Sequence, residues 1–311
     1  MPALLFATEF ATVWVQDPFV LYRSYLWAIG LPGLVFLLVS GTPGRTLLVV
    51  GLGIGALLVW QALDRVISMS TPTRAFTDAI DKLPDDPRSV GRWFPYLNRG
   101  NAYLDNEQPA LAARDFEASA ELGDLGMGAF NLGAMHLLAG RGQQALAAFD
   151  RAEKQGYDQA NLPFERGRTL LAMGRIPEAY DQFVAAYRMP LRSPTRELLL
   201  FNLGRICIQM GRREEAVSIL ERLLQYDPNH KEGRALLGIA YVMTGQNEKA
   251  RALLDKLLRE GPSGRAYYAR AMANYGLKRK AEAIADIDAA IRIGPDNPNL
   301  REWQAKIRAM P

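Results

Sequence analysis

The sequence predicts an all-α protein in two parts: an N-terminal two-helix transmembrane hairpin, and an α-α superhelix (solenoid) of about six helical hairpins closed by a C-terminal capping helix. Two observations predict this fold class. Most of the apolar excess lies in residues 1–65, and from residue 93 onward small, alanine and large apolar positions recur at a step of 33 to 37 residues. A step of this length is typical of stacked helical hairpins. We divide the chain into an N-terminal segment (1–18), the hairpin (19–65), a connector with a possible half repeat (66–92), the repeats (93–296) and the capping helix (297–311).

The membrane hairpin is predicted from two uncharged apolar stretches. Residues 46–63 contain no charge, and a spanning helix needs about 20 apolar residues, with about 17 as the lower limit. Residues 25–40 are also uncharged, and this stretch reaches Phe19 if Arg23 extends to the interface. Residues 41–45 between them form a turn of helix-stopping residues. A secretory signal peptide is the alternative, but it requires a basic start and a single short apolar run.

The flanking arginines predict the orientation of the hairpin. The turn holds Arg45, and the outer flanks hold Arg23, Arg65 and Arg74. Because basic residues favour the cytoplasmic side, we expect both ends and the repeats in the cytoplasm. Gly51 and Gly55 form a small-xxx-small face in the second helix, which favours close packing on a membrane partner. Tolerated glycines at these positions are an equally good reading.

The connector contains one short amphipathic helix. It can begin after Ser70-Thr71-Pro72 and run to about Leu83, with Phe76 and Ile80 on one face. Its spacing matches the second half of a repeat, so the hairpin would join the solenoid with little slack.

Six repeats align on a small residue in a first helix and an alanine twelve positions later. The small residues are Gly100, Gly133, Gly167, Gly204, Gly238 and Ala271. The alanines are Ala112, Ala145, Ala179, Ala216, Ala250 and Ala283. Four residues after each alanine stands a large apolar residue: Phe116, Phe149, Phe183, Leu220, Leu254 and Ile287. Small residues let crossing helices approach, and the large residue fills the space between hairpins.

This pattern resembles the tetratricopeptide repeat family. "NRGNAYLDNEQPALAARDF", "NLGAMHLLAGRGQQALAAF" and "LLGIAYVMTGQNEKARALL" show it most clearly, and the resemblance covers residues 93 to about 296. It implies a superhelix whose first helices line a concave groove for a protein or an extended peptide. Residues 297–310 supply a terminal cap, with Leu300, Trp303 and Ile307 facing inward.

The resemblance places candidate partner-binding residues two positions before and one position after the small residue. The candidate groove residues are Asn98, Asn101, Asn131, Arg168, Asn202 and Arg205. Family members use groove asparagines to hold a peptide backbone, and an amide offers both a donor and an acceptor. The arginines could hold a carboxylate. The competing interpretation is that they are solvated residues of a helix face. The two rows predict a groove that is polar over repeats one to four and apolar over repeats five and six.

The sequence predicts no catalytic activity, no cofactor and no metal site. The single cysteine, Cys207, excludes a disulfide framework, and with His136 and His230 it gives no metal-ligand spacing. His136 and Cys207 fall at core positions, and Phe130, Phe164 and Phe201 lean toward the core rather than the groove. The net charge of +4 is spread along the repeats, so nucleic acid is not an expected partner.

We therefore predict a membrane-anchored scaffold that binds proteins, not an enzyme. The order of two spans, a connector and repeats is similar to the PelE-like inner-membrane repeat proteins of the bacterial Pel exopolysaccharide machinery. This resemblance implies a two-pass protein of the bacterial inner membrane, other inner-membrane proteins and the lipid bilayer as partners, and a role in exopolysaccharide biosynthesis and biofilm formation. The alternatives are a periplasm-facing assembly chaperone for envelope or secreted proteins, and a regulator of a partner enzyme.

Overall fold

The computed structural model describes residues 44–84, 86, 89–294 and 298–309. All the regular structure in these ranges is helical. The chain divides into two units, residues 1–75 and 76–311, which are described separately. Helix α5 (Pro72–Asp81) runs across the division.

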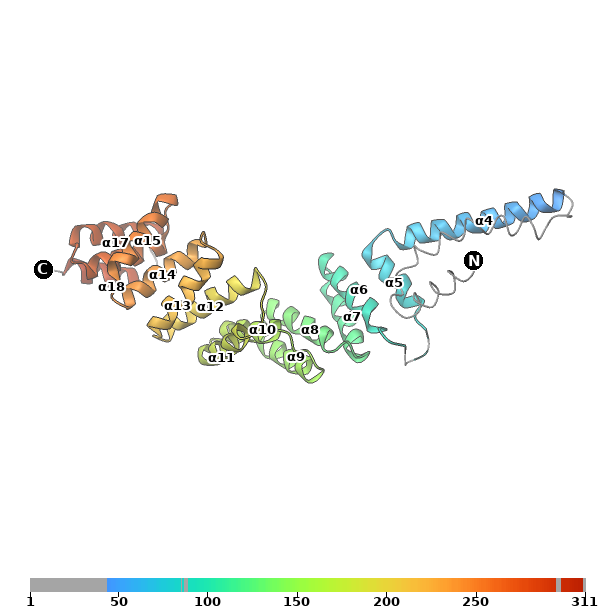
Figure 1. The fold of residues 1–311 in the computed structure, drawn as a ribbon, viewed down its shortest axis with the longest axis horizontal. Helices are drawn as coiled ribbons and strands as arrows, with labels where there is room; N and C mark the ends of the chain where they lie inside the picture. Colours follow the sequence, from blue (N-terminus) through green and yellow to red (C-terminus); the bar gives the residue numbers. More distant parts are fainter. Residues whose placement is uncertain (1–43, 85, 87–88, 295–297, 310–311) are drawn as a thin grey trace, which may run out of the picture. The chain divides into compact units, whose positions relative to one another are not determined.

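The first unit contains α4 (Gly44–Ser68), which is long and apolar enough to cross a membrane (Figure 1). Its stretch from Gly51 to Ser68 has a mean hydropathy of 1.2, and none of it is buried. A helix that is apolar all round and not buried in a protein core fits a membrane span by its length and composition. Its exposed large side chains are Leu48, Val49, Leu52, Ile54, Leu57, Leu58, Val59, Trp60, Leu63, Val66 and Ile67.

The described residues do not support the two-span prediction, because they contain one candidate span and not two. The second predicted span, residues 46–63, lies within α4, and α4 is the one candidate span among the described residues. The N-terminal segment (1–18) and the first predicted span, residues 19–40, lie outside the described residues. A Cβ added at Gly51 or Gly55 would meet nothing within 4 Å in the described part, so the face they form is open.

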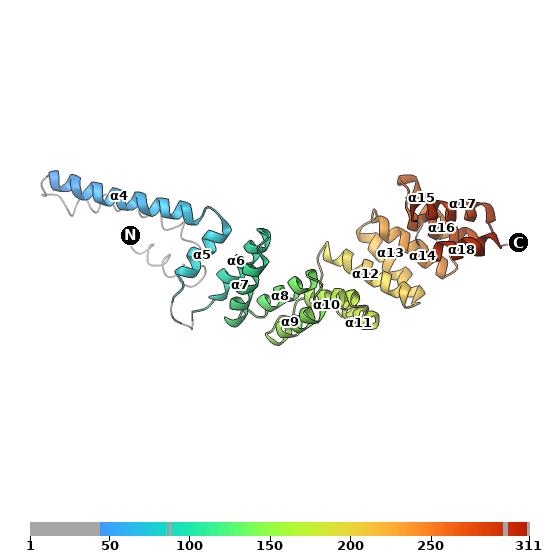
Figure 2. The same cartoon turned by 180° about the vertical axis from the view of Figure 1, so that it is seen from behind.

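The second unit is a solenoid of six helical hairpins and a final helix (Figures 1 and 2). The first helices are α6 (Trp93–Asp105), α8 (Met127–Leu138), α10 (Asn161–Ala172), α12 (Thr195–Gln209), α14 (Lys231–Met243) and α16 (Gly264–Gly276). The second helices are α7 (Pro109–Glu121), α9 (Gly142–Lys154), α11 (Ile176–Tyr187), α13 (Arg213–Tyr226), α15 (Asn247–Glu260) and α17 (Lys280–Ile293). The final helix is α18 (Pro298–Arg308).

The repeated positions form the core of every hairpin. All six alanines and all six large apolar residues that follow them are fully buried. In repeat two, for example, the ring of Phe149 lies against Gly133, where a Cβ would come within 2.5 Å of the ring. The missing side chain therefore makes the space that the aromatic ring occupies.

Each first helix ends in the same turn. The residue seven positions after the small residue has a positive φ in all six repeats, from 58° to 75°. In the four middle repeats this residue is a glycine: Gly140, Gly174, Gly211 and Gly245. In the first and last repeats it is Glu107 and Lys278. The next residue donates its N–H to a carbonyl five positions earlier, as Arg141 does to His136 at 2.8 Å and Arg279 does to Asn274 at 2.8 Å. This is the Schellman motif, which satisfies the last carbonyls of the helix.

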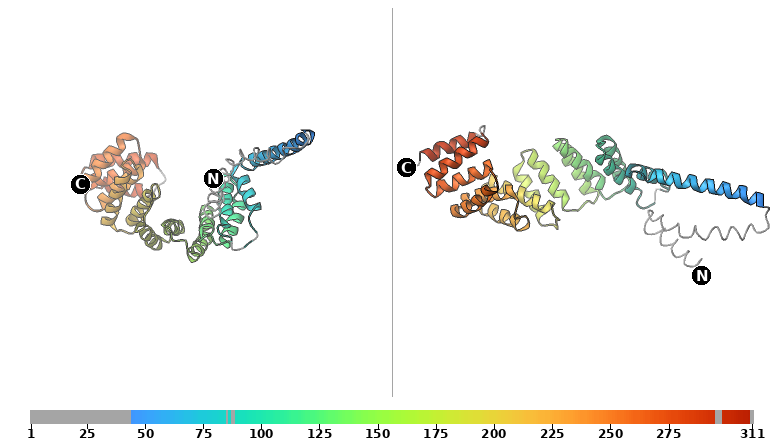
Figure 3. Two further views of the ribbon diagram at one scale, coloured as in Figure 1. Left: turned by 45° about the vertical axis from the view of Figure 1, so that its right-hand side comes forward. Right: turned by 90° about the horizontal axis from the view of Figure 1, so that it is seen from above.

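The hairpins stack through neighbouring helices, as the parallel rows in the right-hand view of Figure 3 show. The packing tightens toward the C-terminus, where α14 and α16 contact each other directly. They can approach because their facing residues are small, and Ala235, Ala266, Ala269 and Ala273 belong to one buried cluster.

The capping helix α18 closes the last hairpin as expected. Leu300 and Ile307 are 6% and 0% exposed, and Trp303 packs against the same cluster with Tyr268 and Tyr275.

Cys207 is fully buried and His136 is half-buried. Phe164 is in the core, whereas Phe130 is half-buried and stacks on Tyr157. Phe201 is also half-buried, with its ring stacked on His230.

Candidate partner-binding surface

The six predicted groove residues lie on first helices, at equivalent positions of repeats one to four. Asn98 and Asn101 belong to α6, Asn131 to α8, Arg168 to α10, and Asn202 and Arg205 to α12. We call the surface that these positions form the first-helix face.

The first-helix face is linked across repeats one and two. The Nδ2 of Asn131 lies 3.4 Å from the Oδ1 of Asn101, so amides of neighbouring hairpins meet there. Asn101 is exposed and Asn131 is half-buried. Asn98 instead donates to the carbonyl of Phe94 on its own helix at 2.8 Å. Because each amide has two donors and one acceptor, all three retain capacity for another hydrogen bond.

In repeat three the first-helix face carries an ion pair. Both carboxylate oxygens of Glu165 accept from Nη1 of Arg168, at 3.0 and 2.9 Å. The Glu165 side chain is 16% exposed and that of Arg168 is 38% exposed. Burial raises the pKa of Glu165, and the opposing effect of Arg168 is smaller. The sequence pattern placed Glu165 in the asparagine row without giving it a role. Its i, i+3 spacing from Arg168 was the signal that could have found the pair.

In repeat four a neutral amide takes the place of that carboxylate. Arg205 donates from Nη2 to Oδ1 of Asn202 at 3.1 Å, and Nδ2 of Asn202 donates to the carbonyl of Leu198 at 2.9 Å. Nε of Arg205 is buried without a hydrogen-bond partner in the described structure. Asn202 is 8% exposed, so its amide orients Arg205 more than it faces solvent.

The apolar end of the first-helix face differs from the prediction. Leu236 and Ala269, which continue the asparagine row into repeats five and six, are 6% and 0% exposed. The row is covered there because α14 and α16 close against each other through their alanines. The asparagine row is therefore accessible in repeats one to three. In repeats five and six the same row is covered and does not form an open apolar groove.

An apolar row that the sequence pattern did not single out borders the polar residues. The residue four positions after the small residue is apolar in every first helix, which puts it one turn further along the same face as the second polar row. Its members are Leu104, Leu137, Leu171, Ile208, Val242 and Tyr275. Leu104 is 37% exposed and the others are half-buried.

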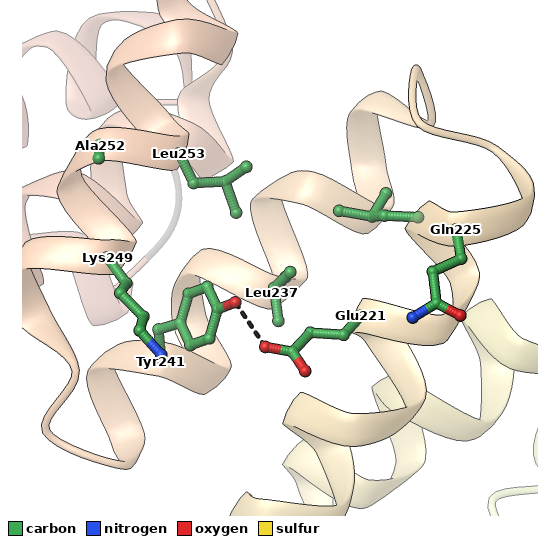
Figure 4. A pocket seen from close by; sticks show the side chains of 8 residues that line it. Glu221, Gln225, Leu237, Tyr241, Lys249, Ala252 and Leu253 are labelled. Carbon is green, nitrogen blue, oxygen red and sulfur yellow. Dashed lines mark hydrogen bonds between the residues drawn. The ribbon is translucent and has the colours of Figure 1, made fainter.

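A hollow of about 440 Å³ lies elsewhere, between second helices α13 and α15 and the first helix α14 (Figure 4). Leu237 and Leu253 line it, and at its edge the hydroxyl of Tyr241 donates to Glu221 at 2.7 Å. Burial, followed by the bond to Glu221, raises the pKa of Tyr241 to about 12. None of the six predicted residues lines this hollow. Among the described residues, no cluster of three or more His, Cys, Asp or Glu side chains could hold a metal ion.

Comparison with known proteins agrees with this architecture. Family models described as tetratricopeptide repeat match residues 97–160, 170–229, 208–275 and 264–297. The search of curated proteins found no match. Among solved structures, the chain is similar to PilF from Pseudomonas aeruginosa, with a TM-score of 0.55 and 19% identity, over 69% of this chain and 97% of that one.

Two further solved structures are similar. A chain of the Cut9–Hcn1 hetero-tetramer of the APC/C matches with a TM-score of 0.51 and 18% identity over 76% of this chain, and this chain spans 45% of the length of that one. YrrB, described as a TPR protein with an unusual peptide-binding site, matches with a TM-score of 0.48 and 19% identity over 75% of this chain and 99% of that one. At these identities the similarity concerns the fold. Together the family matches cover more than half of the chain, and the chain belongs to the tetratricopeptide repeat family.

Proposed function

We propose that this protein is a membrane-anchored scaffold whose first-helix face binds a segment of a protein partner. Tetratricopeptide repeat proteins generally mediate protein–protein interactions, and they are typically scaffolds without catalytic activity. We also propose that the chain is organised as an N-terminal segment, a membrane hairpin, a connector, the repeats and a cap, and that the first four of these end at residues 18, 65, 92 and 296.

The observation that carries the binding proposal is the meeting of Asn101 and Asn131 across two hairpins. Their 3.4 Å contact puts amides of consecutive repeats side by side, each with hydrogen-bonding capacity to spare. A peptide backbone presents the same donors and acceptors at regular intervals. Asn98 extends the amide row, and Asn202 contributes by orienting Arg205. Arg168 and Arg205 would add positive charge, and the apolar row would take the alternate side chains of the segment.

The anchor in this proposal is a two-pass hairpin of the bacterial inner membrane with the repeats in the cytoplasm. The exposed apolar surface of α4 supports one span. Gly51 and Gly55 would pack on the first span or on another membrane protein. Anchoring raises the concentration of a bound partner next to other membrane proteins.

The finer assignment is a role like that of the PelE-like proteins in exopolysaccharide synthesis and export. It is supported by the order of apolar segments, connector and repeats along the chain. In that role the scaffold would hold a cytoplasmic enzyme and inner-membrane proteins together.

The test is affinity purification of the full-length protein from gently solubilised membranes, with co-purifying proteins identified by mass spectrometry. One sample carries Asn98→Ala, Asn131→Ala and Asn202→Ala together. The matched control carries Gln143→Ala and Gln144→Ala, exposed amides on the second helix α9.

Loss of a partner from the triple variant, with retention by the control, would support the proposal. A partner retained equally by both would place the binding surface elsewhere. Recovery of only periplasmic or secreted partners would replace the cytoplasmic orientation by the assembly-chaperone alternative, and a partner enzyme whose turnover changes on binding would favour the regulator alternative.

A further inference from the structure

The hollow between α13, α14 and α15 is an apolar site that lies outside the first-helix face (Figure 4). We call it the α13–α15 hollow. Leu224 of α13, Leu237 of α14 and Leu253 of α15 line it, with the exposed Ala252 at its edge. Its volume of about 440 Å³ lies within the roughly 300–1,000 Å³ of pockets that bind small ligands. The hollow therefore has room for a side chain from outside the protein.

In repeat three an arginine spans the corresponding space. Leu237 stands directly before the small residue of its repeat, and the residue at this position of repeat three is Arg166. Arg166 donates from Nη2 to Asp150 at 2.7 Å and to Glu153 at 2.8 Å, both on the preceding second helix α9. These two residues stand five and eight positions after the repeated alanine. The long guanidinium side chain thus joins α10 to α9 across their junction.

The same two positions of α13 line the hollow, but no arginine reaches them from α14. They are Glu221 and Leu224. Leu237 is shorter than arginine and has no donor, and Glu221 accepts instead from the hydroxyl of Tyr241 at 2.7 Å. The space that Arg166 spans in repeat three is therefore left open beside α14.

The junction between repeats three and four shows what else occupies such a place. It also has a leucine before the small residue, Leu203, and a tyrosine stands beside it. Tyr187 is at the position equivalent to Leu224 and packs against the apolar cluster that contains Leu203. Arg222 of the next second helix donates to its hydroxyl at 2.6 Å and lies over its ring, 5.3 Å from the centroid. A phenol ring thus occupies this leucine-lined junction, and the next junction has the smaller Leu224.

Polar groups at the edge of the hollow suit a phenol hydroxyl. Glu221 accepts a hydrogen bond from Tyr241, and a carboxylate can accept several. Lys256 is exposed, lies one turn beyond Ala252 on α15, and stands at the position that Arg222 has on α13. The hollow and its edge therefore fit an apolar ring with a polar tip that both donates and accepts, which is the tyrosine side chain.

We propose that the α13–α15 hollow is a second docking site, which takes the side chain of a tyrosine from a protein partner. The ring packs between Leu224, Leu237 and Leu253. The hydroxyl donates to Glu221 and accepts from Lys256. Aromatic side chains in pockets are the commonest anchors of protein interfaces. Because the site is separate from the first-helix face, it stands independently of binding there, and a scaffold with both surfaces holds two protein segments at once.

The experiment measures the binding of three fluorinated probes to the full-length protein in mild detergent by fluorine NMR titration. The first probe is N-acetyl-fluorotyrosinamide, a capped tyrosine. The second is N-acetyl-trifluoroleucinamide, a capped aliphatic counterpart. The third is fluorocresol, the tyrosine side chain without a backbone. All samples contain the same detergent, so partition of a probe into micelles is common to them.

Two variants fill the hollow and one serves as the matched control. Leu224→Tyr copies Tyr187, and Ala252→Trp places a ring at the exposed edge without changing the core. The control is Ala147→Trp, because Ala147 is the equivalent exposed alanine of the second helix α9. Circular dichroism checks that each variant is folded.

We expect the capped tyrosine to bind wild type with a Kd of about 1 mM, the strength that the binding energy per atom of small ligands gives for one anchored side chain. Both filled variants should weaken this binding at least about tenfold, since the ring loses its buried contacts. The capped leucine should bind at least about threefold more weakly, because it lacks the hydroxyl that bonds to Glu221. Ala147→Trp, and the variant with alanine at Asn98, Asn131 and Asn202, should bind the capped tyrosine as wild type does.

The proposal is overturned if the capped tyrosine does not bind, if Ala252→Trp binds it as well as Ala147→Trp does, or if the capped leucine binds as tightly. Tighter binding of fluorocresol than of the capped tyrosine would assign the hollow to a small phenol and reject a protein partner. Weakened binding in the asparagine variant would reject the separation of the hollow from the first-helix face.

Discussion

Arg99 and Asp115 are joined by a two-pronged ion pair inside the first hairpin. Nε of Arg99 donates to Oδ2 of Asp115 at 2.7 Å and Nη2 donates to Oδ1 at 2.8 Å, with Asp115 almost fully buried. Arg270 and Asp286 repeat this pair at the equivalent positions of the last hairpin, at 2.9 and 2.6 Å. An arginine–aspartate ion pair thus joins the two helices of the first hairpin, and an equivalent pair joins those of the last.

Breaking the first pair should destabilise the solenoid. We expect Asp115→Ala to lower the free energy of unfolding by about 3 kcal/mol, because it leaves the half-buried Arg99 without its carboxylate. Repeat two has Leu132 and Ala148 at these positions. The double variant Arg99→Leu, Asp115→Ala copies that apolar solution and should lie within about 1 kcal/mol of wild type. Urea titration followed by circular dichroism checks both, and a double variant as unstable as the single one would contradict the explanation.

The glycine of repeat two should not accept a methyl group. A Cβ on Gly133 would lie 2.5 Å from the Phe149 ring, and overpacking of this kind costs roughly 1–3 kcal/mol. Repeat six combines Ala271 with Ile287 instead. Gly133→Ala should therefore lower stability, and adding Phe149→Ile should cost less in the Gly133→Ala variant than in wild type. A double-mutant cycle in urea measures the difference, and strict additivity would count against the steric explanation.

The outer repeats should gain stability from a glycine at the helix-ending turn. Glu107 and Lys278 have φ values of 58° and 60°, where the middle repeats have glycine. A side chain in this left-handed region costs about 1 kcal/mol. Lys278→Gly should raise the thermal midpoint, since the strain it removes exceeds the entropy that glycine adds to the unfolded chain. Lys278→Ala, which keeps the Cβ, is the control and should not raise it.

The stability of the solenoid should depend on the protonation of Glu165. Its pKa is raised above the ordinary value of 4.5 by burial, so the folded state favours the protonated carboxyl. This contribution is fully present below pH 4.5 and is lost as the pH rises through the raised pKa. Glu165→Gln should therefore equal wild type near pH 4 and be more stable at pH 7, as urea midpoints across this range would show.

Glu178 provides the control with the opposite sign. Arg175 lowers the pKa of Glu178, so its contribution is present above the ordinary value and is lost as the pH falls. Glu178→Gln should not become more stable than wild type at neutral pH. A gain at pH 7 in both variants would show that the effect is not specific to the buried carboxyl.

Cys207 should be inert in the folded protein. It is fully buried, and burial followed by the charge of Glu215 raises the pKa of its thiol to about 12. Since the thiolate is the reactive form, we expect no labelling by Ellman's reagent at pH 8 in the native state. In urea the labelling rate should follow unfolding of repeat four, and rapid labelling without denaturant would contradict the buried position.

How far the sequence could predict the structure is clearest within single hairpins. The spacing from Gly133 to Ala145 and Phe149 sufficed for the pairing of helices in repeat two, because each residue contacts a neighbour within its own hairpin or the next one. The capping role of Leu300 and Ile307 followed in the same way. The sequence also predicted a helix over residues 46–63, and these residues lie within α4.

The chemistry of the first-helix face was only partly accessible from the pattern. Residue type and register placed Asn98, Asn131 and Arg168 on first helices. They could not show that Asn202 turns inward to hold Arg205, because hydrogen bonding within a helix depends on rotamers and burial.

Local, short-range packing is thus what the sequence by itself determined: six hairpins in register, their buried alanines and large apolar residues, and a polar row on the first helices. Only the tertiary structure decided how closely those helices approach. It closed α14 on α16 and buried Leu236 and Ala269, and it enclosed Glu165 beside Arg168. The distance between neighbouring first helices follows from the summed packing of several side chains at each junction, which no single repeated position specifies.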